Sequence, residues 1–519
     1  MRKKILLISY ENEGNNIYQL SKELKKNNFE VLILDGAIST AVEFNQMPRN
    51  VYKGLDIPIK RFNEKIEKRI FNNNAITQLK EIEKKLKGRN IRQIMRTSSV
   101  IYDDHHNRKP FYKIPSNDIY RQNYTLEIIN WYISEIEEFK PDICFCILGN
   151  CLLKVLAGSL SESYSYKFCS LSHSRIKNYI IPLNWDFKPL KRKIKSNNNN
   201  QKIAKQIYSD LTNIIYKNFN KKDFFKLNII EISVISLFKN LKTFLGFFLI
   251  FLKTCLIIKS YKIKNLSNGV ILPKPIYFYS SPWFVMKFFI NRYTRKTLLE
   301  INSKRIFKSE DQIKKNRKNG FKYILYTMHV LPESSVLTFS KKYYEEDLIR
   351  YISGILPIEK KLLVKESLEM MGDRDLAFYD RVNKLGNIDF INPYISPKNT
   401  FNQIEGVIGI SGTSILEAIF NKLPCACIGE PEFKELVPKR YQDYKGLENL
   451  FEDMVNNNPV IIPKKKIIDY IENLVDWNIK FSYNEWKSAS NDSTREIVRM
   501  NKSNLLKSLE DFIINFSKD

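Results

Sequence analysis

Tyr323-Ile-Leu-Tyr-Thr-Met328 opens the stretch that organises this chain, which runs from Lys322 to Glu430. Short apolar runs bounded by Gly, Pro, Asn or charge alternate there with amphipathic segments, a pattern typical of buried parallel strands joined by crossover helices. The predicted strands are Tyr323–Met328, Lys361–Lys365, Ile388–Ile391, Val407–Ile410 and Cys425–Ile428. The predicted helices, in which apolar residues recur at helical spacing, are Lys342–Ile355, Asp375–Leu385 and Thr413–Asn421.

Alternating strands and helices predict a doubly wound α/β domain, whose ligands bind where the carboxyl ends of the strands meet the helix N-termini. Polar residues follow three of the predicted strands. His329 and Glu333 come after the first strand, Lys365 and Glu366 end the second, and the turn Ser411-Gly412-Thr413 follows the fourth. We therefore expect the functional site at this edge of the sheet.

The turn at Gly412 predicts an anion site. Glycine lets the backbone bend closely, and the N–H groups and positive dipole end of the following helix suit a phosphate. Lys365 would add a positive charge, and His329 with Glu333 would supply an acid/base pair. The alternative is an ordinary helix N-cap, which Ser and Thr provide routinely. Three polar strand ends in one sheet favour the anion site.

The order and spacing of several motifs resemble the C-terminal half of the bacterial capsule polysaccharide biosynthesis proteins. The motifs are Tyr323–Glu333, Leu363–Glu366, Gly372-Asp-Arg374 with Phe378-Tyr379, Asn387–Pro393, and Ser411-Gly412-Thr413 with Glu417-Ala418. The resemblance implies a GT-B-like α/β fold with two Rossmann-like lobes. It also implies a glycosyltransferase of surface polysaccharide assembly. Such an enzyme would transfer a sugar, with Kdo as the first candidate, from a CMP-linked donor to a glycan or glycolipid acceptor.

The same resemblance implies roles for individual residues. His329 and Glu333 would act on the transferred sugar as catalytic residues, and Arg374 would bind substrate. The transfer would need no metal and no cofactor, because the nucleotide sugar is itself the substrate. The nucleotide and its phosphates would be held by Lys365, Glu366, Ser411, Gly412, Thr413 and Glu417.

Ser367 departs from the family pattern, since a histidine is expected there near the phosphates. Serine can donate one hydrogen bond but cannot carry charge or shuttle a proton near neutral pH. The departure leaves open a different donor sugar, a loss of activity, or a non-catalytic partner in a polysaccharide assembly or export complex. A nucleotide-sugar 2-epimerase of GT-B-like fold would share the phosphate turn and is a third alternative.

Residues 1–185 predict a second Rossmann-like lobe, which would face the acceptor. The turn at Gly14, between the first strand and helix, lacks the dinucleotide fingerprint. A later strand, Lys167–Leu171, runs into a polar segment suited to a carboxylate, since arginine offers bidentate contact. An ordinary basic loop is the alternative. The candidate substrate-binding residues of this segment are His173, Arg175 and Asn178.

Residues 186–320 predict a basic linker and an apolar helical insertion. The apolar stretch Leu227–Ile258 contains no run long enough to span a membrane. It predicts either a buried helical hairpin or an amphipathic segment at the inner-membrane surface. The C-terminal nucleotide-sugar lobe is expected over residues 321–460, and C-terminal helices over 461–519. Apolar residues that would return these helices to the first lobe are Ile497, Leu505, Leu506, Leu509 and Phe512.

The composition is that of a globular protein, with 43% hydrophobic and 27% charged residues. The net charge of +28 favours an anionic partner such as a nucleotide, a charged glycan or a membrane surface, whereas no motif supports nucleic-acid binding. Seven cysteines without zinc-type spacing predict buried thiols in a reducing compartment, and hence a cytoplasmic protein. Asp103-Asp104-His105-His106 alternates faces on an extended segment, so no metal site is expected.

Overall fold

The computed structural model describes residues 2–9, 14–35, 57–61, 74–97, 118–147, 152–176, 179–190, 198–213, 245, 282–330, 345–374, 376–395, 397–477 and 507–517. Several predictions fall outside these residues. They concern Glu333, Asn178, the side chain of His173, Asp103–His106 and, apart from Leu245, the apolar stretch Leu227–Ile258.

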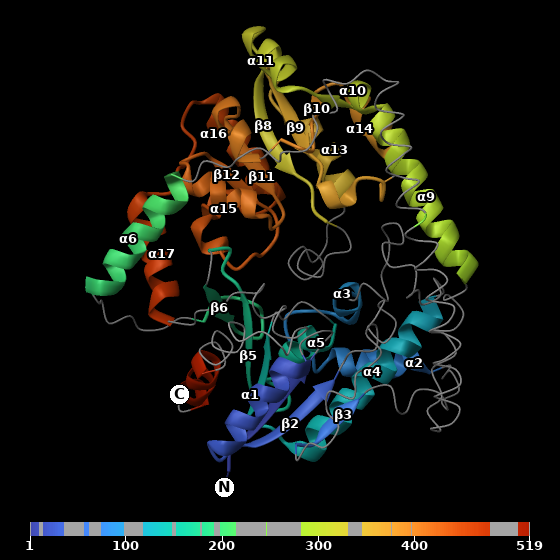
Figure 1. The fold of residues 1–519 in the computed structure, drawn as a ribbon, viewed down its shortest axis with the longest axis vertical. Helices are drawn as coiled ribbons and strands as arrows, with labels where there is room; N and C mark the ends of the chain where they lie inside the picture. The colour runs from blue at the N-terminus through green and yellow to red at the C-terminus, as the bar shows by residue number, and fades with distance from the viewer. Residues whose placement is uncertain are drawn as a thin grey trace.

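Two six-stranded sheets form two lobes, one above the other in Figure 1. The N-terminal sheet has the order β3-β2-β1-β4-β5-β6 and is parallel except for β6, which runs antiparallel to β5. Its strands are β1 (Lys4–Ser9), β2 (Glu30–Asp35), β3 (Ile59–Arg61), β4 (Ile143–Ile147), β5 (Lys167–His173) and β6 (Ile180–Leu183).

The C-terminal sheet has the order β12-β11-β8-β9-β10-β7 and is parallel throughout. Both sheets place their first long strand centrally, with the next two strands on one side and the following two on the other, which is the Rossmann order. This topology confirms the predicted GT-B-like fold with two Rossmann-like lobes. The strands are β7 (Phe307–Lys308), β8 (Lys322–Thr327), β9 (Lys360–Lys365), β10 (Ile388–Ile391), β11 (Gly406–Gly409) and β12 (Cys425–Cys427).

Helices cover both sheets and bury the strands, which explains why the strands read as continuous apolar runs. In the first lobe the helices are α1 (Gly14–Lys26), α2 (Ala75–Glu83), α3 (Ile91–Arg96), α4 (Asp118–Phe139) and α5 (Leu152–Leu160). In the second lobe they are α9 (Pro282–Ile301), α10 (Ser303–Ile306), α11 (Glu310–Lys318), α13 (Glu345–Ile355), α14 (Leu376–Asn383), α15 (Thr413–Phe420) and α16 (Tyr444–Val455), with the 3-10 turns η6 (Leu368–Met370), η7 (Pro397–Gln403), η8 (Lys434–Leu436) and η9 (Lys439–Tyr441).

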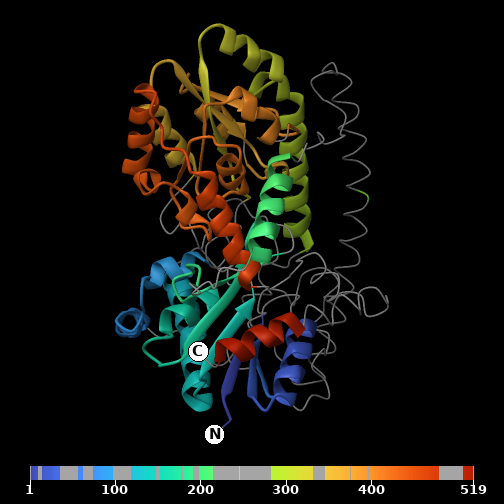
Figure 2. The ribbon, with the colours of Figure 1, turned by 90° about the vertical axis from the view of Figure 1, so that its left-hand side faces the viewer.

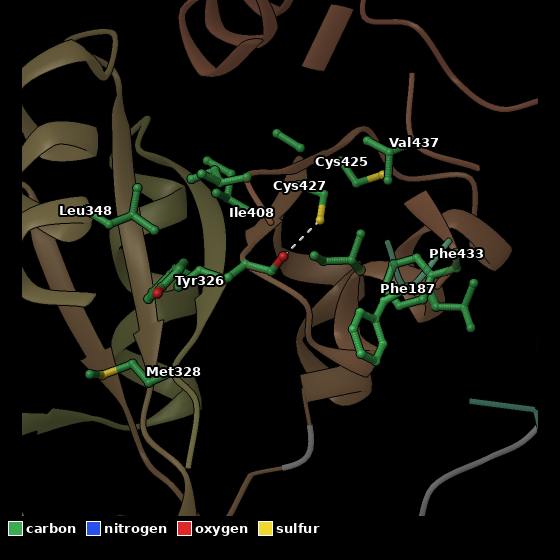
Figure 3. Packing of buried hydrophobic residues seen from close by; sticks show 14 of the residues in the cluster. Phe187, Tyr326, Met328, Leu348, Ile408, Cys425, Cys427, Phe433 and Val437 are labelled. Carbon is green, nitrogen blue, oxygen red and sulfur yellow. Dashed lines mark hydrogen bonds between the residues drawn. The ribbon is translucent and has the colours of Figure 1, made fainter. Parts of the chain in front are cut away.

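The core of the second lobe is tightly packed around its central strands. Tyr326 and Ile408, from neighbouring strands, are fully buried, and the thiol of Cys427 donates to the carbonyl of Ile410 at 3.0 Å (Figure 3). All described cysteines are free and buried, and burial raises the pKa of Cys425 to about 12. These thiols are therefore protonated core residues, as the sequence predicted.

Two boundaries differ from the sequence prediction. The second lobe begins before residue 321, because β7 pairs with β10 as the edge strand of its sheet. A strand of two residues carries no periodicity that a sequence can reveal. The basic linker, predicted over Lys188–Lys202, also ends earlier, because α6 (Asn198–Asn213) begins within it. This helix buries Ala204 and Tyr208 and packs beside α17 (Lys464–Trp477), as Figure 2 shows.

The end of the chain returns to the first lobe. Helix 507–517 places Leu509 and Phe512 in the cluster that contains Ile5 and Leu7 of β1, and the Phe512 ring lies 6.3 Å from that of Phe145. This contact confirms the prediction for Leu509 and Phe512, while Ile497, Leu505 and Leu506 lie outside the described residues. Within the described part of the chain, no helix has the length and apolarity needed to span a membrane.

Candidate functional site

The ends of β8 and β11 meet at the start of α15, because these strands are neighbours in the sheet. The hydroxyl oxygens of Thr327 and Ser414 lie 2.5 Å apart across this junction. A methyl group built on Gly412 would lie 3.4 Å from Oγ1 of Thr327 and 3.5 Å from Cε1 of His329. Two of the three predicted strand ends therefore meet at one place, with the His329 ring against the glycine turn.

The first turn of α15 has no side-chain cap. Its N-cap residue is Gly412, with φ −73° and ψ 152°, which makes no side-chain hydrogen bond to the backbone of the helix. This excludes the ordinary Ser or Thr cap that the sequence left open. Ser411 is buried, Thr413 is exposed and Glu417 is half-buried. The first turn of α15 therefore has backbone N–H groups and a positive dipole end, and its N-cap residue has no side chain that could bind them.

Lys365 ends β9 beside this junction and is 7% exposed. Its Nζ donates to the carbonyl oxygen of Pro393 at 2.7 Å. Burial lowers the pKa of Lys365 to about 8, and the nearby charge of Glu366 partly opposes this shift. The ammonium remains mostly protonated at neutral pH and gives this edge of the sheet a positive charge from within the protein.

Glu366 and Arg374 are buried and bind each other. Nε of Arg374 donates to Oε2 of Glu366 at 2.7 Å, and the hydroxyl of Tyr379 donates to the same oxygen at 2.9 Å. The backbone N–H of Ser367 donates to Oε1 of Glu366 at 2.7 Å. Burial raises the pKa of Glu366 and the Arg374 guanidinium opposes this shift. With exposed fractions of 0% and 6%, these two side chains hold the loop together and do not face open space.

The sequence did not single out Glu345, the first residue of α13. Its carboxylate is 2% exposed and accepts from Nη2 of Arg374 at 2.5 Å and from the backbone N–H of His329 at 2.6 Å. Glu345 begins a run of three acidic residues, and acids are common at helix N-termini because of the dipole. Nothing in the sequence sets it apart from its half-buried neighbour Glu346.

The Gly372-Asp-Arg374 motif has a clear structural basis. Gly372 has φ +90°, and a methyl group there would lie 2.8 Å from the backbone oxygen of Arg292 in α9. Asp373 forms an ion pair with Arg292 at 2.7 Å. The glycine thus lets the loop approach α9, the aspartate holds it there, and the arginine turns inward to the buried carboxylates.

In the first lobe, Arg175 follows β5 in the left-handed region, with φ +63°. The Ser174 hydroxyl fixes this turn by donating to the carbonyl of Tyr179 at 2.7 Å. Nε of Arg175 donates to Oε1 of Glu432 in the second lobe at 2.7 Å. Arg175 therefore links the two lobes through this ion pair. Glu432, whose side chain is fully buried, is a second residue that the sequence did not single out.

No protein-family model matches the chain, and no curated protein matches its sequence. Among solved structures, the β-Kdo 2,7 transferase KpsC of Thermosulfurimonas dismutans is 10% identical and aligns over 67% of this chain and 89% of that chain, with a TM-score of 0.30. UDP-GlcNAc 2-epimerase of Methanocaldococcus jannaschii, in complex with UDP-GlcNAc and UDP, is 12% identical over 92% of this chain and 100% of that chain, with a TM-score of 0.24.

The glycosyltransferase VinC in complex with dTDP is 8% identical over 98% of each chain, with a TM-score of 0.20. Identities and TM-scores this low assign no family, so the fold class stands on the strand order described above. Among the described residues, no three His, Cys, Asp or Glu side chains are grouped so that they could hold a metal ion.

Proposed function

We propose that this protein is a GT-B-type glycosyltransferase of surface polysaccharide assembly. It would transfer a sugar from a nucleotide-activated donor, with CMP-Kdo as the first candidate, to a glycan or lipid-linked acceptor. The observation that carries the proposal is the meeting of His329 and Thr327 with Gly412, the glycine N-cap of α15. The donor and its class come from the motif resemblance in the same stretch of sequence.

The geometry supports a phosphate at this turn. An anion at the start of α15 would accept from backbone N–H groups and interact favourably with the helix dipole. Lys365 adds positive charge from the neighbouring strand, while Thr327 and Ser414 supply hydroxyl groups at the junction. As the leaving group departs, charge develops on its phosphate, so fixed donors at this position would stabilise the transition state.

The imidazole of His329 is the group we propose to act on the transferred sugar. It would accept the proton of the acceptor hydroxyl as a general base or stabilise the developing cationic centre, with Glu333 as the paired carboxylate. In this proposal Arg175 would contact a carboxylate of donor or acceptor from the first lobe, together with His173 and Asn178. The protein would work in the cytoplasm, at the inner-membrane surface when its acceptor is lipid-linked.

Gly412→Ala tests the phosphate turn directly. Alanine fits the observed φ, and its methyl group would meet only the Ser414 hydroxyl at 3.3 Å and more distant atoms. It would nevertheless fill the space through which a phosphate approaches the backbone. We expect titration calorimetry to show CMP binding weakened by roughly tenfold or more, the equivalent of at least one lost charge-assisted hydrogen bond.

The matched control is Gly354→Ala in α13, where the added methyl group meets nothing within 4 Å. Unchanged CMP affinity in Gly412→Ala, or equal losses in the two variants, would remove the phosphate turn from the proposal. Incubation with CMP-Kdo and an acceptor then separates the functions. Acceptor-dependent nucleotide release supports the transferase, an isomerised nucleotide sugar supports a 2-epimerase, and binding without turnover supports a non-catalytic partner, as Ser367 would suggest.

A further inference from the structure

The backbone of His329 is held at both of its polar atoms by buried charged side chains. Its N–H donates to Oε1 of Glu345 at 2.6 Å, and its carbonyl accepts from Nη2 of Arg374 at 3.0 Å. The same Nη2 donates to Oε2 of Glu345, which closes the ring of contacts. We infer that Glu345 and Arg374 are positioning residues, a buried clamp that sets where the His329 ring meets the glycine turn. The part of this inference that concerns chemistry rests on the proposed function.

The clamp joins several elements of the second lobe. Glu345 begins α13, and Arg374 precedes α14. Arg374 also binds Glu366 at the end of β9, and the neighbouring Asp373 ties the loop to α9. A guanidinium with several fixed donors suits this arrangement, because it can bind two carboxylates and a carbonyl in one plane. The position of His329 therefore depends on four elements of the second lobe.

Stability alone does not explain these charges. Replacing a buried ion-pair network by well-packed apolar residues is often neutral or stabilising, because burying the charges costs as much as their attraction returns. Two carboxylates and one guanidinium nevertheless lie buried here, and two of these three groups, Glu345 and Arg374, bind the backbone of His329. Orientation of His329 gives this network a role that apolar side chains could not fill.

The His329 ring should report on the clamp spectroscopically. The chain contains only four histidines, so imidazole signals of protein labelled selectively at histidine can be assigned, with His329→Gln identifying the signal of interest. Glu345→Gln keeps the size of the side chain but removes the charge that binds both Arg374 and the His329 N–H. We expect the His329 ring signals to shift or broaden, while the signals of the other histidines stay in place.

Glu346→Gln is the matched control. Glu346 is the next residue of the same helix turn, but it faces outward and pairs with Arg350 and Arg381. We expect no change in the His329 signals of this variant. Coincident His329 signals in wild type and Glu345→Gln would overturn the inference, as would equal shifts in Glu345→Gln and Glu346→Gln.

Arg374→Lys is a second test of the clamp, for use if Glu345→Gln does not fold. Lysine keeps the charge but cannot make the separate contacts of the guanidinium, so we expect the same His329 shift. These spectra need no substrate. They therefore test whether Glu345 and Arg374 position His329 even if transferase activity is never found. If activity is found, a clamp acting through His329 predicts that Glu345→Gln lowers kcat and leaves KM nearly unchanged. An unchanged kcat with a shifted His329 signal would exclude the catalytic part of the inference.

Discussion

Strand β9 carries a buried lysine at each end, and the two lysines have opposite surroundings. At the amino edge of the sheet, Lys360 is 1% exposed and its Nζ lies 2.6 Å from Oε2 of Glu405. At the carboxyl edge, Lys365 is 7% exposed and its ammonium donates to a backbone carbonyl. Among the described residues, no carboxylate lies within ion-pair distance of Lys365.

The two lysines differ in whether a carboxylate of the protein balances their charge. At the amino edge a carboxylate balances the cation, so the protein itself completes the interaction. At the carboxyl edge the charge of Lys365 is desolvated and its pKa falls to about 8. Groups whose pKa is strongly shifted by burial are common at functional sites, where a bound ligand can supply the opposite charge that the protein does not. The comparison supports the carboxyl edge as the place where an anion binds.

The largest change in stability at the carboxyl edge is expected when the guanidinium of Arg374 is removed. Arg374→Met would leave the carboxylates of Glu345 and Glu366 buried without their shared partner. We expect the free energy of unfolding to fall by about 3–5 kcal/mol, as is usual when one partner of a buried ion pair is removed. Urea denaturation followed by circular dichroism measures this loss.

Arg381→Met is the control for that measurement, because Arg381 pairs with the partly exposed Glu346 at the surface. Its expected cost is below about 1 kcal/mol, the usual range for exposed ion pairs. Similar costs for the two variants would mean that the buried network contributes no more than a surface pair.

Lys365→Met should stabilise the protein at pH 7. A lysine whose pKa falls from 10.5 to about 8 on folding disfavours the folded state while it is charged. Removing it should therefore raise the free energy of unfolding by as much as about 3 kcal/mol, since each pKa unit corresponds to about 1.4 kcal/mol. Urea titrations of both proteins at several pH values measure the difference.

The sign of the pH dependence is fixed by linkage. Between pH 8 and 10.5 the unfolded chain binds more protons at Lys365 than the folded protein does, so the wild type gains stability as the pH rises. The advantage of Lys365→Met should therefore shrink across this window. A constant advantage would show that packing, and not the buried charge, accounts for the gain.

Lys360→Met should have the smallest effect, and the opposite sign. It would remove the shorter of the two lysine contacts of Glu405, but that side chain is 38% exposed and keeps its contact with Lys322 at 3.2 Å. We expect a loss of about 1 kcal/mol, because water screens the remaining carboxylate. Stabilisation by both Lys360→Met and Lys365→Met in the same urea assay would remove the contrast between the two edges.

Local patterns were sufficient to predict most of the second lobe. The runs Tyr323–Met328 and Val407–Ile410 form strands where the alternation indicated them, and Thr413 begins a helix as its turn predicted. Rossmann order then brings the ends of β8 and β11 together, so the approach of His329 to Gly412 follows from topology.

Contacts between segments distant in the sequence could not be predicted in this way. Glu366 and Arg374 have the residue types of ligand contacts, yet their partners are Glu345 and each other. Lys365 binds the carbonyl of Pro393, and no pattern of side chains marks a backbone acceptor. Glu432 meets Arg175 from another lobe. Each of these pairings is set by how elements pack and not by periodicity.

The return of helix 507–517 to the first lobe has a consequence for synthesis of the chain. Ile5, Leu7 and Phe145 complete their core with Leu509 and Phe512, more than 350 residues later in the sequence. Figure 2 shows the helix that carries these two residues, in red, beside the strands of the first lobe. Domains that are contiguous in sequence can fold as they leave the ribosome. Here the first lobe must leave part of one sheet face uncovered until residues 507–517 have left the ribosome, so this lobe cannot finish folding before the second lobe has been made.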